Sequence, residues 1–139
     1  MAAPLWSLHP RLSEDTFLLG ELALCRVLLM ADARYPWLLL VPRRADTIEI
    51  IDLDDQAQAQ LSGEITQASR ALKQITQCDK LNVAAIGNIV PQLHIHIIAR
   101  NRGDASWPSP VWGKGEAVSY EEAARDRLLA ALRGEMGLE

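Results

Sequence analysis

The feature of this sequence that most constrains its fold is a stretch in which polar and apolar residues alternate. Residues 92–98 read Gln-Leu-His-Ile-His-Ile-Ile. A period of two is typical of a β-strand that buries one face in the core. Leu93, Ile95 and Ile97 are therefore expected in the core, whereas Gln92, His94 and His96 are expected together on the opposite face.

Apolar runs elsewhere predict more strands. Residues 22–30 (LALCRVLLM) and 37–41 (WLLLV) are joined by a short polar connection ending in Pro36, which favours an antiparallel pair, although 22–30 alone could equally form a buried helix. Residues 81–86 (LNVAAI) and 93–99 (LHIHIIA) are separated by turn-forming Gly, Asn and Pro. A second hairpin is expected there.

Two helices are predicted from periodicity. Asp54 or Asp55 can cap a long helix, because apolar residues follow at alternating spacings of four and three. These residues are Leu61, Ile65, Ala68, Leu72 and Ile75. Ser119 and Glu122 have the spacing of a capping box ahead of a C-terminal helix. The Gly-, Pro- and Ser-rich residues between 101 and 116 should form a structured loop.

These elements predict the fold class. The chain has 139 residues, 49% of them hydrophobic, which suits one domain spanning residues 1–139. Strands interrupted by one helix and followed by another favour an α+β fold. We expect an antiparallel sheet of about five strands, with one long helix after the second strand and a helix at the C-terminus.

Charge and cysteine content exclude several partners. The net charge is -4 and the charges are interspersed, which argues against nucleic acid as a ligand. No signal peptide and no run of about 18 apolar residues is evident, so we expect no membrane association and a cytoplasmic location. Cys25 and Cys78 belong to no CxxC pair and are expected to be reduced.

Two histidines on one face of a strand are candidates for a catalytic site. A neutral imidazole is a competent nucleophile and titrates near neutral pH. The alternatives are a structural role in the core and a zinc or iron site, because His-x-His is also a ligand pair. A metal needs a third ligand, and the nearest following acid is Asp104, in a loop beyond His96. We therefore expect neither a metal nor another cofactor.

The segment resembles the histidine triad motif, His-φ-His-φ-His-φ-φ with φ apolar, with Gln92 standing where the first His would be. Residues 81–90 (LNVAAIGNIV) are similar to the family's Asn-containing strand and Gly-polar turn, and residues 36–44 (PWLLLVPRR) resemble its strand ending in Val-Ile-Pro-Lys. Trp107-Pro108 resembles a Trp-Pro element of some branches. The likeness covers roughly residues 22 to 113.

The resemblance implies a nucleotidyl hydrolase or transferase. His94 would attack the α-phosphorus and form a covalent nucleotidyl-histidine, His96 would donate a hydrogen bond to the phosphate or the departing oxygen, and Gln92 would orient the pair. The substrate would be a dinucleoside polyphosphate, as in diadenosine tetraphosphate hydrolases, or a phosphoramidate. The rival hypothesis is a protein that binds or senses a nucleotide with slow or no turnover.

The resemblance also implies binding residues and a partner. Asn82, Gly87 and Asn88 match positions near the family's phosphate site, and Asp32 corresponds to an acid that holds ribose hydroxyls. Trp107, like Trp112, would cover the base or pack on a second subunit, or simply anchor its loop. Family members commonly form homodimers through the long helix and the neighbouring strand, so a homodimer is expected.

The substitution at position 92 separates the two hypotheses. A Gln side chain donates and accepts hydrogen bonds but cannot change charge, so a proton relay through this position is lost. The triad pattern therefore predicts that Gln92→His raises turnover and leaves binding intact. The remaining histidine, His9, is expected on the surface without a role. Arg43 and Arg44 either contact phosphate or keep the chain soluble.

Overall fold

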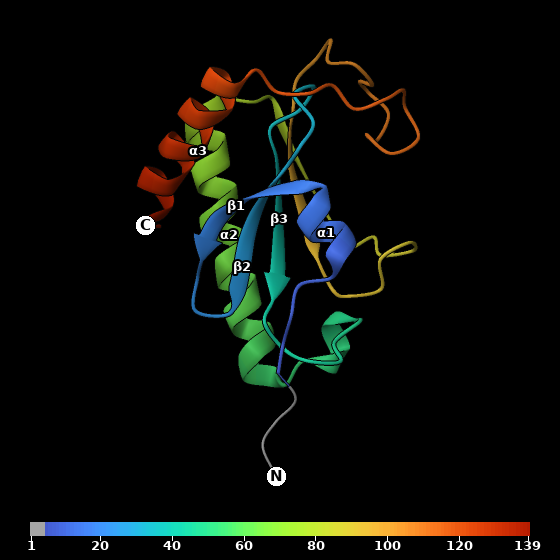
Figure 1. Ribbon diagram of the computed structural model, residues 1–139, viewed down its shortest axis with the longest axis vertical. Coiled ribbons are helices and arrows are strands. Elements are labelled where there is room, and N and C mark those ends of the chain that lie inside the picture. The colour runs from blue at the N-terminus through green and yellow to red at the C-terminus, as the bar shows by residue number, and fades with distance from the viewer. Residues whose placement is uncertain (1–4) are drawn as a thin grey trace.

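The computed structural model describes residues 5–139 and shows an antiparallel sheet with helices on both sides (Figure 1). The elements in chain order are α1 (Pro10–Glu14), β1 (Thr16–Glu21), β2 (Cys25–Met30), β3 (Trp37–Pro42), the short 3-10 helix η1 (Ile50–Asp52), α2 (Asp55–Thr76), β4 (Lys80–Ala84), β5 (Ile95–Arg100) and α3 (Glu122–Met136). The five strands lie in the order β1-β2-β3-β5-β4, and every neighbouring pair is antiparallel. The predicted α+β class is confirmed.

The strand that the apolar pattern does not predict is β1. Its register with β2 shifts between Leu18 and Gly20, and Leu19 is its only buried residue, so the alternation that marks a strand is broken. The predicted strand 22–30 begins only at Cys25, because a turn precedes it. Because β1 precedes the two predicted strands, the long helix α2 follows the third strand of the chain and not, as expected, the second.

The long helix begins as predicted, at Asp54. The Asp54 carboxylate accepts a hydrogen bond from the backbone N–H of Ala57 at 2.8 Å, which caps the helix. The predicted capping box of α3 is wrong. Glu121 occupies the N-cap position without a side-chain bond, so Ser119 lies outside the helix, too far back to cap it.

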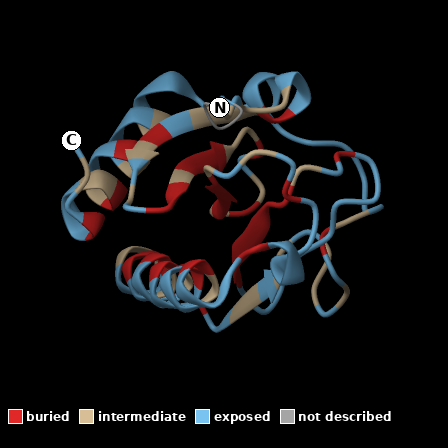
Figure 2. Cartoon of the chain, turned by 90° about the horizontal axis from the view of Figure 1, so that it is seen from below, coloured by how far each residue is buried: buried red, intermediate tan, exposed pale blue. Residues whose placement is uncertain are grey.

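The sheet has a core on each face. α2 and α3 cover one face, where Leu61, Leu72 and Leu132 pack against the strands. On the other face, Leu12 of α1 packs with Trp37, Ile98 and loop residues in a second cluster. Figure 2 shows the buried residues gathered at the centre of the molecule, on the strands and the inward sides of the helices. β5 lies between β3 and β4, and all six of its residues are buried.

Two further observations bear on expectations from the sequence. Cys25 and Cys78 are both buried free thiols. Within residues 5–139, none of the helices combines the length and the apolar character needed to span a bilayer.

Candidate functional site

His94 and His96 lie side by side on the face of β5 opposite the long helices. Their ring centroids are 4.8 Å apart, and the two residues are 6% and 4% exposed. Leu93, Ile95 and Ile97 belong to the core cluster on the helix side. The alternation predicted for this segment is therefore confirmed, although the strand itself begins only at Ile95.

The hydrogen bond of the His94 ring fixes its tautomer. Nδ1 lies 2.7 Å from the carbonyl oxygen of Gln92. A carbonyl can only accept, so Nδ1 carries the proton and Nε2 keeps its lone pair. Burial lowers the pKa of His94, and the charge of His9 lowers it further, against an opposing effect of the bond to Gln92. His94 is therefore held neutral, and among the described residues its Nε2 has no hydrogen-bond partner.

The His96 ring is held in the opposite tautomer. The indole N–H of Trp37, which can only donate, bonds to Nδ1 of His96 at 3.0 Å. The proton of a neutral ring must then be on Nε2, which donates to the carbonyl of Ile86 at 3.3 Å. Burial, together with the charge of His94, lowers the pKa of His96 to about 4. The pair thus offers one lone pair and one N–H donor.

A small pocket lies beside His94. Its volume is about 100 Å³, and its lining residues are Ile48, Glu49, Ala85, Gly87, Asn88, Pro91, Gln92, Leu93 and His94. A Cβ atom on Gly87 would lie 2.7 Å from the carbonyl oxygen of Val90 and 3.7 Å from Cε1 of His94. Only glycine therefore lets this turn pass so close to the ring. The pocket is large enough for a phosphate group but smaller than the roughly 300 to 1,000 Å³ that enclose a whole organic ligand.

Asn82 is on the histidine face but is occupied by another partner. Its amide oxygen accepts from Nη1 of Arg100 at 2.9 Å. Arg100 is 2% exposed and also pairs with Asp104 at 2.8 Å, and this bond to Arg100 holds the pKa of Asp104 at about 2. Asn82 is not among the residues lining the pocket beside His94. Its contacts support the loop that follows β5.

Asp32 is likewise engaged within the protein. Its carboxylate accepts from the side chain of Arg34 at 2.9 Å and from the backbone N–H of Val118 at 3.3 Å. Burial raises the pKa of Asp32, but these hydrogen bonds outweigh that effect, so its pKa lies below the ordinary value. Asp32 lines a second pocket of about 550 Å³, whose apolar wall includes Trp37 and Trp112.

Of the two tryptophans in the loop after β5, the one that contacts the histidine pair is Trp112. Its ring centroid lies 5.0 Å from that of His96 and 6.0 Å from that of Trp37, in edge-to-face geometry. Trp107, which the sequence favoured through its Trp-Pro element, precedes a cis peptide bond and lies against the guanidinium of Arg100 at 5.7 Å. Trp107 therefore packs within the loop after β5.

Gln92 uses its main chain and its side chain differently. The main-chain carbonyl orients His94. The side-chain amide instead bonds to the N-terminal segment, accepting from the N–H of His9 at 2.8 Å and donating to the carbonyl of Ser7 at 2.9 Å. The orienting role expected of this residue is thus performed by its backbone. Sequence reasoning missed this link because the partners are 83 and 85 residues away.

The other charged candidates have partners of their own. Arg43 donates to the carbonyl of Leu22 at 2.7 Å and pairs with Glu21 at 3.2 Å. Asp104, the acid considered as a third metal ligand, is bound to Arg100. Across the described residues, no group of three or more His, Cys, Asp or Glu side chains is arranged to hold a metal ion.

Comparison with known proteins identifies similar chains. The model of the HIT domain family matches residues 11–103. A solved histidine triad protein of Bradyrhizobium japonicum is 59% identical, with a TM-score of 0.95 over 96% of this chain and 99% of its own. A histidine triad protein of Marinobacter aquaeolei VT8 is 44% identical, with a TM-score of 0.93 over 96% and 98%.

More distant similarity concerns the fold alone. A hypothetical histidine triad nucleotide-binding protein of Sulfolobus tokodaii is 18% identical, with a TM-score of 0.66 over 88% of this chain and 85% of its own. No curated protein matches the chain.

Proposed function

This chain belongs to the HIT domain family, and we propose that it is a nucleotidyl hydrolase or transferase in which His94 is the nucleophile. One observation carries the proposal: the two rings are held in opposite tautomers, so the Nε2 lone pair of His94 lies beside the Nε2–H of His96, whose long bond to the carbonyl of Ile86 would be exchanged for one to the phosphate. That combination suits attack on a phosphorus whose oxygens need a hydrogen bond.

The proposed reaction has two steps. In the first, Nε2 of His94 forms a bond to the α-phosphorus, and the bond to the leaving group breaks with its electron pair going to the leaving oxygen or nitrogen. The N–H of His96 stabilises the charge that develops on the phosphate or the departing atom. In the second, water attacks the phosphorus and loses a proton to solvent, while the bond from phosphorus to Nε2 of His94 breaks with its electron pair returning to Nε2, which releases a nucleoside monophosphate and free His94.

Pocket sizes suggest how the substrate lies. The hollow beside His94 accepts a phosphate group, whereas the second pocket, about 550 Å³, falls in the range of nucleoside-sized ligands. Trp37 and Trp112 line the second pocket and contact His96, whereas His94 lines the first pocket, so the two spaces adjoin different members of the histidine pair.

A specific observation favours the rival function, nucleotide binding with slow or no turnover. The side chain of Gln92 contacts residues 7 and 9 rather than either catalytic ring, so it relays no proton. His96 is also neutral over the physiological range, because its pKa is about 4. The site can therefore stabilise negative charge but has no obvious strong acid for the leaving group.

Trapping the covalent intermediate distinguishes catalysis through His94 from nucleotide binding without turnover. The protein and His94→Ala are incubated with adenosine and guanosine phosphoramidates and with dinucleoside polyphosphates, quenched within the first turnover, and digested for mass spectrometry. We expect a nucleotidyl adduct on His94 and release of the monophosphate only with the wild type. Saturable binding without adduct or turnover would establish the rival. Equal cleavage by both proteins would refute His94 as nucleophile.

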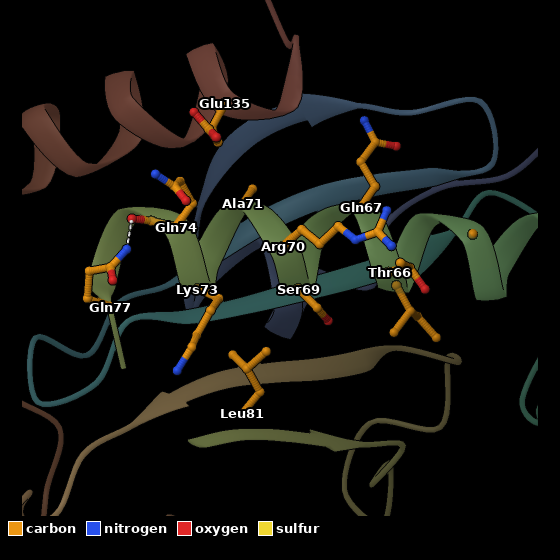
Figure 3. Close-up of a pocket in the computed structure, with 12 residues that line it drawn as sticks. Thr66, Gln67, Ser69, Arg70, Ala71, Lys73, Gln74, Gln77, Leu81 and Glu135 are labelled. Atoms are coloured by element: carbon orange, nitrogen blue, oxygen red, sulfur yellow. Dashed lines mark hydrogen bonds between the residues drawn. The ribbon is translucent and has the colours of Figure 1, made fainter. Parts of the chain in front are cut away.

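We further propose a homodimer formed through α2 and β4. β4 is the last strand of the sheet, so one of its edges is unpaired, and Val83 on it is 49% exposed. Beside it, residues of α2 and Glu135 of α3 surround an open hollow of about 890 Å³ (Figure 3).

A second copy of the chain suits this surface. The surface carries both Arg70 and Glu135, so a two-fold axis can bring opposite charges together. Sedimentation equilibrium of the wild type and Arg70→Glu tests this. We expect a dimer that weakens in the variant, with Arg127→Glu on α3 as control, and a monomeric wild type would contradict it.

A further inference from the structure

The side chain of Gln92 binds an extended piece of backbone at two points. Oε1 accepts from the N–H of His9, and Nε2 donates to the carbonyl of Ser7. In an extended chain the C=O of one residue and the N–H of the residue two positions on point the same way. A primary amide carries its acceptor and donor on one carbon and can therefore pair with both groups at once.

A histidine or a carboxylate at position 92 cannot form this pair of bonds. The two nitrogens of an imidazole point away from each other, so a His could reach only one of the two backbone groups. A carboxylate could accept from His9 but has no proton for the carbonyl of Ser7. The contacts therefore explain a glutamine at this position as a tether for residues 7–9.

The tether brings a third imidazole to the site. His9 is half-buried, and its Nδ1 accepts from the backbone N–H of Arg11 at 3.1 Å, which fixes the ring orientation and leaves Nε2 without a hydrogen bond among the described residues. A charge on His9 lowers the pKa of His94. The backbone N–H of His9 bonds to the side chain of Gln92, and the main-chain carbonyl of Gln92 bonds to the ring of His94, so Gln92 links the two histidines directly.

We propose that Gln92 tethers the N-terminal segment beside the imidazole pair, and that His9 is the third imidazole of the site, a positioning residue that acts on the charge of His94. The histidine trio is thus completed by a residue 83 positions upstream of Gln92. The proposal deepens the proposed function, but it rests on contacts that exist without turnover.

The charged surroundings of His94 set the direction of the effect. His9 reaches it from the N-terminal segment, His96 from β5, and Glu49 lines the same pocket from the loop at η1. The imidazole of His9 disfavours a positive charge on His94, whereas the carboxylate of Glu49 would favour it, and His96, with a pKa of about 4, carries no charge near neutral pH. Removing the imidazole of His9 should therefore let His94 take up a proton at higher pH.

Histidine NMR titration measures this directly. Wild type, His9→Asn and Ser7→Ala are compared, with His94 signals assigned through His94→Ala. Asn keeps an N-cap acceptor at position 9, so α1 is retained, and Ser7 contributes only its main chain to the tether, which makes Ser7→Ala the matched control. We expect the His94 midpoint to move to higher pH in His9→Asn alone. An unchanged midpoint in His9→Asn overturns the role of His9.

Amide hydrogen exchange tests the tether. The N–H of His9 should be protected in the wild type, exchange at least tenfold faster in Gln92→Ala, which removes its acceptor, and exchange faster than the wild type in Gln92→His, which can keep at most one of the two bonds. Equal protection in all three proteins overturns the tether. The pH midpoint of the His94 titration should move to higher pH in Gln92→Ala, as in His9→Asn.

The turnover rate of Gln92→His is a separate test of the tether. The tether predicts that Gln92→His lowers turnover, the opposite of what the triad pattern alone predicts, so a faster Gln92→His enzyme would contradict the tether as well. If no adduct forms on any substrate, the proposed function fails, yet the titration and exchange experiments still decide the roles of His9 and Gln92.

Discussion

The two faces of the sheet are held by different kinds of contact. On the helix side, Leu61, Leu72 and their neighbours form an apolar core in which any well-packed side chain of similar volume would serve. On the histidine side, single hydrogen bonds join residues far apart in sequence, such as Trp37 with His96 and His9 with Gln92. Both faces therefore contribute apolar packing to stability, and the histidine side in addition sets the protonation and position of a few atoms.

The largest effect should come from the helix side and leave the site intact. Leu72 is fully buried, so Leu72→Ala removes apolar contacts and leaves a cavity, costing roughly 2 to 5 kcal/mol of unfolding free energy. Urea denaturation measures the loss, with Gln74→Ala on the exposed side of α2 as the control. The His94 and His96 NMR signals of the folded variant should keep their wild-type titration. Altered titration would show that the two faces are coupled.

Acid should destabilise the protein through the histidine side. In the unfolded chain His96 titrates near its ordinary value of 6.5, but in the folded protein its pKa is about 4. Between these values the unfolded state binds a proton that the folded state does not, so the contribution of His96 to stability is complete above pH 6.5, falls as the pH falls towards 4, and changes no further below it. The loss amounts to about 3 kcal/mol.

Unfolding free energies measured from pH 7 to 4 test that slope. His96→Gln cannot titrate, so its stability should fall less steeply over the same range, with the remaining slope due to His94 and the carboxylates. Parallel curves for the two proteins would mean that His96 is not held neutral by the fold.

The same contrast explains what could be predicted from sequence. Periodicity and capping residues are local, so α2 with its cap at Asp54 and the alternating face of β5 follow from the pattern. β1 was missed because its bulge at Leu18 and Gly20 interrupts the alternation. Sequence reasoning brought together only those candidate residues that share a strand or a turn. His94 and His96 form the ring pair, and Gly87 and Asn88 line the pocket beside His94.

The remaining site contacts depend on tertiary structure. Asn82 and Trp107 contact Arg100, and Asp32 contacts Arg34, pairings that the sequence does not specify. Trp112 reaches His96 only because the loop after β5 folds back over the sheet. His9 was assigned to the surface, since nothing near it in sequence indicates that Gln92 binds its backbone.

A smaller effect is expected from Gly87→Ala. The added Cβ would lie 2.7 Å from the carbonyl oxygen of Val90, so the turn must move away from His94, at a cost of roughly 1 to 3 kcal/mol. We expect about a tenfold loss of kcat/KM with activated substrates. Gly134→Ala, whose Cβ would meet nothing within 4 Å, is the control. Full activity in Gly87→Ala would show that the turn can relax without moving the pocket.

The smallest change removes one hydrogen-bond donor from the histidine side. Trp37→Phe keeps an aromatic ring beside His96 but deletes the indole N–H that fixes its tautomer, which costs about 1 kcal/mol. Nδ1 of His96 is then free to carry the proton, and a share of the molecules no longer presents an N–H at Nε2. We expect kcat to fall several-fold with little change in KM, because the lost donor acts on charge that develops in the transition state.

Nitrogen-15 chemical shifts of His96 report that tautomer directly, whatever the activity. Wild type should show a single form protonated at Nε2, and Trp37→Phe a mixture. Tyr35→Phe is the matched control, since it removes a hydroxyl from the same core cluster that bonds to Ser106 rather than to either histidine. If His96 keeps one tautomer in Trp37→Phe, the carbonyl of Ile86 alone is enough to hold it, because that bond also requires a proton on Nε2.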